Sequence, residues 1–209
     1  MPLTRKLIRK NKAMLSGSQK RNGYMKWWHS FTGINTITGE NKSFFVEVFI
    51  INPLRSPSIP VYGQLYRQKN KEHMPSYIMV KAGSWGKNAK QIHNFYPCSK
   101  LKKNNKFLDL NINNIHVSET ELSGSVTMDE KIAKLHPELM SDGGSMSWDL
   151  KMTKRSPYDL GIATSTLFGK LNMFKMLWHV QGMETLYNGM VTLDGQTYKV
   201  VPNQSFGYA

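Results

Sequence analysis

Short segments in which apolar and polar residues alternate recur along most of this 209-residue chain. A period of two is that of a β-strand with one buried face, and it is clearest in residues 107–112 and 145–153. Residues 43–52 are instead apolar nearly throughout, which indicates a strand that is buried on both faces or packed on another layer. Glu47 is the unusual charged residue within this strand.

A β-hairpin is predicted at residues 184–199. Tyr187 and Val191, which favour extended backbone, precede Asp194-Gly195, and Tyr198 follows this pair. Asp-Gly is a strong hairpin signal because both central residues of the tight turn must adopt a positive φ. Taken alone, the pattern fits an ordinary surface hairpin with two buried aromatic side chains as well as part of a ligand-binding sheet.

Several shorter segments complete the pattern. Further strands are predicted at residues 24–32, 61–67, 76–82, 92–96, 115–119 and 121–128. Many short strands at close spacing, with turn residues between them, predict an all-β sandwich or barrel. Residues 131–139 fit one or two helical turns, and the pattern of residues 165–176 does not decide between helix and strand.

The region around the predicted hairpin resembles a known family. The residues concerned are Trp178, His179, Gly182, Thr185, Gly189, Asp194, Gly195, Tyr198 and Tyr208. Together with the aromatic run at residues 23–28, they resemble the tocopherol cyclase family, which is related to hydroxyneurosporene synthases and to AttH-like tandem lipocalin-like proteins. The resemblance runs in order from Asn22 to Ala209, and the family typically continues beyond this point with a KNWG segment.

The resemblance implies a fold and a division of the chain. It implies an all-β fold built of lipocalin-like antiparallel β-barrels in tandem. We therefore expect a basic leader at residues 1–20 and a first barrel at 21–154. Residues 155–209 are expected to form a linker and the start of a second, incomplete barrel, since Arg155-Ser156-Pro157 interrupts the strands there.

The chain carries a formal net charge of +14 and has a pI near 9.8. The basic residues crowd into the first 21 residues and into residues 100–106, where solvated polar surface is the simplest interpretation. We expect no nucleic-acid partner, because exposed aromatic residues do not interleave with basic ones along the sequence. Residues 1–19 could form a short helix that either caps the barrel or makes peripheral contact with an anionic membrane.

The cysteine count and the hydropathy of the sequence indicate the cellular location of the protein. A single cysteine, Cys98, excludes an internal disulfide framework. No apolar run approaches the roughly 20 residues that span a bilayer, and no secretory signal follows the basic start. A cytoplasmic bacterial protein is the expectation, and the oligomeric state is left open.

The sequence lacks the motifs of cofactor and metal chemistry. It contains no phosphate-binding or dinucleotide-binding glycine pattern and no G-x-S-x-G elbow, and its six histidines stand far apart. We therefore expect neither a cofactor nor a metal site. An apolar small molecule inside the barrel is the expected partner, because small β-barrels can enclose one such ligand. The predicted ligand-binding residues are Trp27, Trp28, Phe31, Phe45, Phe49, Trp148, Trp178 and Tyr187.

The resemblance also implies a chemistry. Tocopherol cyclases protonate a prenyl double bond so that a phenol oxygen can capture the cation, and hydroxyneurosporene synthases hydrate an isoprenoid alkene. Either reaction needs a proton donor in an apolar cavity, and we expect Glu184 or His179 to supply it. Glu47 is the alternative acid, although it could equally be a salt-bridge partner between barrels. Two functions stay open: an enzyme that cyclises or hydrates an isoprenoid, and a lipocalin-like protein that only binds a hydrophobic ligand.

Overall fold

Eleven antiparallel strands form a single curled sheet in the computed structural model, which describes residues 9–62, 74–157, 180–202 and 207–209. The sheet begins at one edge with β4 (Lys90–Tyr96), β3 (Tyr77–Ser84), β2 (Asn41–Ile51) and β1 (Tyr24–Asn35). It continues through β11 (Gln196–Val200), β10 (Glu184–Leu193), β9 (Gly144–Arg155) and β8 (Glu121–Met128). It ends with β7 (Ile115–Ser118), β6 (Asp109–Ile112) and β5 (Leu101–Lys103). The predicted all-β antiparallel fold is confirmed.

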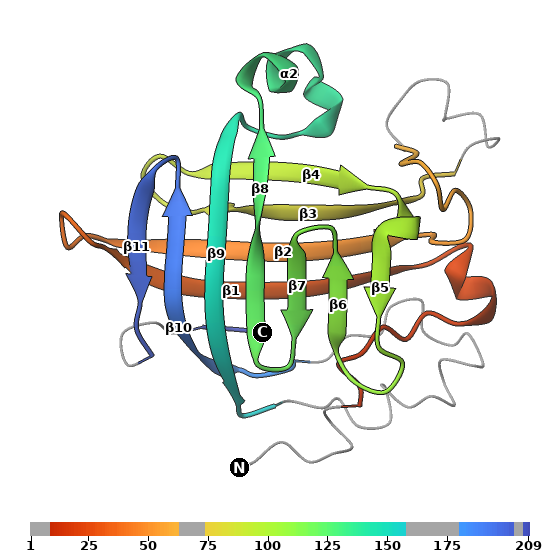
Figure 1. Ribbon diagram of the computed structural model, residues 1–209, viewed down its shortest axis with the longest axis horizontal. Coiled ribbons are helices and arrows are strands. Elements are labelled where there is room, and N and C mark those ends of the chain that lie inside the picture. Colours follow the sequence, from red (N-terminus) through yellow and green to blue (C-terminus); the bar gives the residue numbers. More distant parts are fainter. Residues whose placement is uncertain (1–8, 63–73, 158–179, 203–206) are drawn as a thin grey trace.

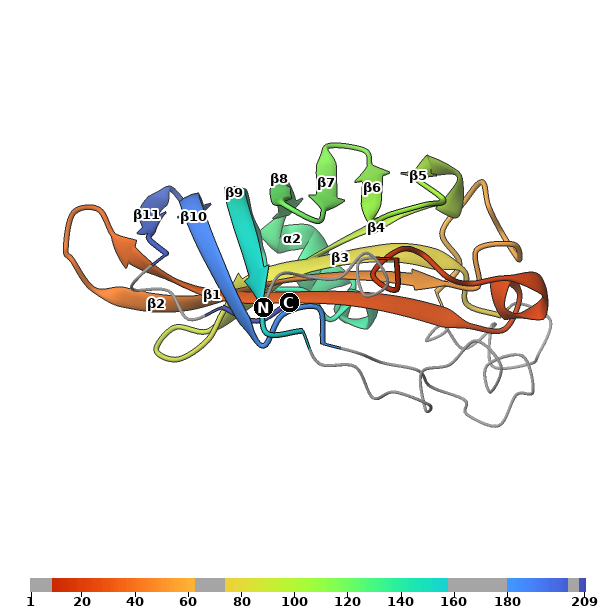
Figure 2. The same ribbon diagram turned by 90° about the horizontal axis from the view of Figure 1, so that it is seen from below.

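The sheet folds back on itself as a half-barrel, so that β1–β4 cross behind the group β5–β11 at a steep angle (Figures 1 and 2). The side chain of Asn94 links β4 to β8 where the two strands approach each other. The Asn94 amide donates to the carbonyl of Thr127 at 2.7 Å and accepts from its N–H at 3.1 Å, in place of a backbone ladder. The apolar core lies between the two layers.

Strand alternation decides which side chains enter this core. In β1 the inward side chains are Trp27, His29 and Phe31, all buried, and those between them face outward. Of the two arrangements predicted for residues 43–52, the structure shows burial of both faces, since Phe44 to Val48 are all buried. Glu47 is tolerated on the outer face because Lys26 and Lys81 approach its two carboxylate oxygens at 2.6 and 2.7 Å.

The predicted hairpin is confirmed as β10 and β11. Its turn residues Asp194 and Gly195 have φ values of 48° and 81°, as a type I′ turn requires. These two strands complete the sheet that β1–β9 begin, since β10 pairs along β9 and β11 pairs with β1 at Ile34 and Asn35. The expected division of the chain near residue 154 therefore falls between two neighbouring strands of one sheet.

The last described residues fill a gap in the sheet between β1 and β10. Tyr208 exchanges backbone hydrogen bonds with Ser30 at 2.9 and 3.0 Å, and the N–H of Thr185 donates to Gly207 at 2.8 Å. Only glycine fits at position 207, because an added Cβ would lie 2.3 Å from the ring of Tyr187. Residues 207–209 are thus part of the sheet that forms the half-barrel.

The helices are short. The helical turns predicted at residues 131–139 are α2 (Glu130–Leu135) and η4 (Pro137–Leu139), and Asp129 caps α2 by accepting from the N–H groups of Lys131 and Ile132. The expected leader helix is absent from residues 9–16, which precede η1 (Gly17–Lys20), while residues 1–8 lie outside the described ranges. None of the described helices is long and apolar enough to cross a bilayer.

Candidate functional site

Ionisable side chains are buried where the inner faces of β1, β9 and β10 meet. The alternation of β9 carries Met146, Trp148, Leu150 and Met152 inward, and the next residue in this series is Lys154. Thr185 lies directly across from Lys154 in the β9–β10 register, and Tyr187 across from Met152. We use the term buried polar cluster for His29, Tyr187, Lys154, Glu119, Gln181 and Asn11.

His29 and Tyr187 form one half of the buried polar cluster. The Tyr187 hydroxyl lies 3.0 Å from His29 Nδ1 and donates to the carbonyl of Tyr208 at 3.1 Å. Because a phenol has one proton to give, we assign the hydrogen of the imidazole to Nδ1, which then donates to the Tyr187 oxygen. His29 Nε2 is left with a lone pair, and among the described residues this buried nitrogen has no hydrogen-bond partner.

Burial keeps both groups neutral. Burial, aided by the positive charge of Lys154, lowers the pKa of His29 from 6.5 to about 3. Burial also raises the pKa of the Tyr187 phenol well above its usual value of 10. At neutral pH, His29 Nε2 is therefore an uncharged hydrogen-bond acceptor on the inner side of the sheet.

Lys154 organises the other half of the cluster. Its ammonium donates to Glu119 Oε2 at 3.1 Å and to Gln181 Oε1 at 2.7 Å. Asn11 donates to the same oxygen of Glu119 at 2.9 Å, and the Trp27 indole donates to the Asn11 carbonyl at 2.9 Å. Burial lowers the pKa of Lys154, while the carboxylate of Glu119 opposes this effect.

Removal of Glu119 is expected to destabilise the fold strongly. Glu119→Gln should lower the free energy of unfolding by about 3 kcal/mol, because it leaves the Lys154 charge buried and uncompensated. The double variant Glu119→Gln/Lys154→Met should recover most of this loss. Urea denaturation measures both values.

The exposed pair between Arg155 and Glu184 provides a matched control. The two side chains are 3.7 Å apart and more than half exposed, so Glu184→Gln should change the stability by less than about 0.5 kcal/mol. Equal losses for Glu119→Gln and Glu184→Gln would contradict the importance of the buried pair.

Of the two expected proton donors, one is on the surface and one is outside the described residues. Glu184 begins β10, and its side chain is 51% exposed and paired with Arg155. It therefore faces away from the core, because the next residue, Thr185, occupies the inward position. His179 and its neighbour Trp178 lie in the stretch 158–179, outside the described ranges.

The expected ligand-binding residues divide between the two faces of the sheet. Trp27, Phe31, Trp148 and Tyr187 are buried on the inner face. In contrast to the expectation, Trp28, Phe45 and Phe49 are on the outer face, because strand alternation separates each of them from its inward neighbours. There Trp28 stacks on Phe45 with ring centroids 5.6 Å apart.

Lys26 and Lys81 complete the packing of the outer face. Their ammonium groups lie 4.8 and 6.0 Å from the centroid of the Trp28 ring. The same two lysines neutralise Glu47, so this carboxylate belongs to an outer-face salt bridge. Glu47 therefore does not approach the buried polar cluster from the inner side of the sheet.

Sequence reasoning missed His29, Lys154 and Glu119 as site residues. A signal for the first two was present, because alternation places His29 between Trp27 and Phe31 and continues from Met152 to Lys154. Glu119 lies in the turn between β7 and β8 and reaches Lys154 from a distance of 35 residues. No local pattern points to such a contact.

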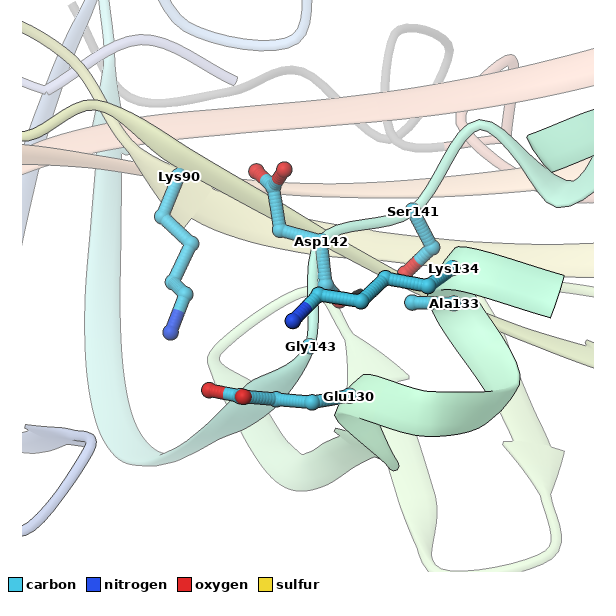
Figure 3. A pocket seen from close by; sticks show the side chains of 7 residues that line it. All are labelled: Lys90, Glu130, Ala133, Lys134, Ser141, Asp142 and Gly143. Atoms are coloured by element: carbon cyan, nitrogen blue, oxygen red, sulfur yellow. Dashed lines mark hydrogen bonds between the residues drawn. The ribbon is translucent and has the colours of Figure 1, made fainter. Parts of the chain in front are cut away.

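A surface depression lies at the other end of β9, beside α2 (Figure 3). It has a volume of about 330 Å³ and is lined by Lys90, Glu130, Ala133, Lys134, Ser141, Asp142 and Gly143. Its charged lining does not suit an apolar ligand. No group of three or more His, Cys, Asp or Glu side chains with metal-binding geometry occurs in the part of the chain that the structure describes.

No known family matches the sequence, and no curated protein matches it either. Kievitone hydratase from Nectria haematococca has a similar structure, with a TM-score of 0.49 and 12% identity over 93% of this chain and 50% of that chain. An AttH-like protein from Nitrosomonas europaea has a TM-score of 0.47 and 7% identity over 88% and 49%. The chain thus spans about half the length of each.

Proposed function

We propose that this protein binds an apolar small molecule on the inner side of the curled sheet, with a hydroxyl group of the ligand at His29 Nε2. The observation that carries this proposal is a fully buried acceptor nitrogen without a partner among the described residues. An unsatisfied buried polar group costs roughly 1–3 kcal/mol. A ligand hydroxyl that donates to His29 Nε2 would recover this cost, and the surrounding inner face is apolar.

Two features support an isoprenoid as the ligand. The residues around the β10–β11 hairpin resemble those of tocopherol cyclases, which act on prenylated phenols. Methionines also line the inner side of the sheet: Met152 lies across from Tyr187, and Met25 packs against the core. Because methionine side chains adapt to irregular shapes, they could admit a flexible prenyl chain.

The buried polar cluster could also act on such a ligand. Ring closure of a prenylated phenol requires one proton to reach the alkene and one to leave the phenol. His29 Nε2 could accept the phenol proton. Lys154 could give the other, because its pKa is lowered and Glu119 and Gln181 take two of its three N–H donors. The proposed activity is therefore that of a cyclase or hydratase acting by proton transfer.

A non-catalytic binder is the second candidate. Its support is that most donors of the cluster already bind within the protein: Tyr187, Lys154 and Asn11 all donate to described protein groups. Such internal hydrogen bonds are typical of polar groups that hold a structure together.

A matched pair of ligands tests the binding proposal. A prenylated phenol should quench the tryptophan fluorescence saturably, and added salt should have little effect because the contacts are apolar. His29→Phe should weaken binding of the phenol by about tenfold, the equivalent of one hydrogen bond at a buried site. The same prenyl chain without the hydroxyl should bind both proteins equally.

His29→Gln controls for damage to the fold, because the glutamine oxygen retains an acceptor. This variant should bind the phenol more tightly than His29→Phe does. Absence of saturable quenching by either ligand, or an equal loss of both ligands in His29→Phe, would overturn the proposal.

A further inference from the structure

Three segments that are distant in sequence meet at one end of the molecule. They are residues 9–22, 52–60 and 97–107, at the right-hand end in Figures 1 and 2. Lys12 donates to the carbonyl of Asn105 at 2.8 Å, and the N–H of Leu54 donates to Lys20 at 2.9 Å. The N–H of Ser99 donates to the carbonyl of Pro57 at 2.6 Å, which links the second and third segments. We call this surface the basic end.

All charged side chains of the basic end are positive. Its three segments contain no Asp or Glu, and they carry several basic residues, among them Lys12, Lys20, Arg55, Lys102, Lys103 and Lys106. Partial burial lowers the pKa of Lys103, and the charges of the nearby Lys20 and Lys12 lower it further. Like charges held together in this way attract a polyanion.

Apolar side chains project from the same surface. Leu54 is 54% exposed, Ile59 is 62% exposed, and Phe107 is 44% exposed. Pro53, Pro57 and Pro60 restrict the backbone of the loop that carries the first two. A stiff loop with exposed aliphatic tips among basic residues differs from ordinary solvated surface, where such tips are isolated.

We propose that the basic end docks on an anionic phospholipid bilayer, with Leu54 and Ile59 in the headgroup region and the lysines against the lipid phosphates. Apolar tips with flanking cations are the combination that a membrane interface favours. A nucleic acid would use the cations but would leave the aliphatic tips in water. The surface involved is assembled by tertiary folding and does not require a leader helix. The proposal does not depend on ligand binding at His29.

Sedimentation with lipid vesicles tests this docking surface. The full chain should bind vesicles of phosphatidylcholine and phosphatidylserine and should not bind vesicles of phosphatidylcholine alone. Lys102→Gln/Lys103→Gln/Lys106→Gln should weaken binding by about a hundredfold, since each lysine near an anionic surface contributes roughly fivefold. Leu54→Ser/Ile59→Ser should weaken it by roughly tenfold through lost apolar burial.

Matched variants elsewhere on the surface control for charge and hydropathy. Lys131→Gln/Lys134→Gln/Lys151→Gln removes the same charge, and Ile37→Ser/Leu135→Ser removes two exposed aliphatic side chains of similar size. Both should bind the anionic vesicles as the unchanged protein does. All these positions are exposed, so the far-UV circular dichroism of every variant should match that of the unchanged protein.

Three outcomes would overturn the proposal. One is vesicle binding that is lost equally in the control variants. Another is a failure of the full chain to sediment with anionic vesicles. The third is binding that survives Leu54→Ser/Ile59→Ser undiminished while a single-stranded oligonucleotide competes with the vesicles, which would make the basic end a nucleic-acid site.

Discussion

Acidification from pH 7 to pH 3 is expected to lower the free energy of unfolding by about 4 kcal/mol through His29 alone. The pKa of His29 is about 3 in the folded protein, against an ordinary value of 6.5 that applies to the unfolded chain. Between these pH values His29 holds a proton in the unfolded state and not in the folded state. Stability therefore falls as the pH drops through this window, and it is insensitive to this group above pH 6.5.

Urea denaturation at several pH values measures this effect against His29→Gln. The variant has no group that titrates at this position, so its stability should decline less steeply below pH 6.5. Between pH 6.5 and pH 3, the free energy of unfolding of the variant should rise relative to that of the unchanged protein by about 1.4 kcal/mol for each unit by which the pH falls. Parallel stability curves would contradict a neutral, buried His29.

Measurement of turnover is expected to show whether the protein is an enzyme or a non-catalytic binder. If the buried polar cluster transfers protons to and from a bound isoprenoid, His29→Gln should reduce turnover of a prenylated phenol by about 10²–10⁴-fold. Binding of the matched prenyl hydrocarbon should stay unchanged, because the variant exchanges one polar side chain for another and leaves the apolar inner face as it is. Product formation under single-turnover conditions measures the chemical step apart from release.

Glu184→Gln serves as the control for this measurement. Its carboxylate is on the surface and pairs with Arg155, so the variant should retain full turnover. A large loss in Glu184→Gln with full activity in His29→Gln would move the chemistry away from the buried polar cluster. Absence of turnover in the unchanged protein, with saturable binding, would favour the non-catalytic binder.

Local features of the sequence determined most of the secondary structure. Alternation identified residues 145–153 as a strand, and the continuous apolar run at 43–52 identified a strand that is buried on both faces or packed on another layer. Asp194-Gly195 identified its hairpin, since few residue pairs accept a positive φ at both positions. These predictions succeeded because each depends on the backbone preferences and side-chain period of a few neighbouring residues.

The tertiary structure decided which face of each strand is inside and which polar groups meet there. Trp27 and Trp28 are equally apolar in sequence, yet the curl of the sheet buries one in the core and leaves the other on the outer face. Glu119 reaches Lys154 only after β8 and β9 pair. Residues 207–209 complete the wall at Tyr187 through backbone bonds that depend on no side-chain pattern. Contacts of this kind arise from long-range pairing, which local periodicity does not encode.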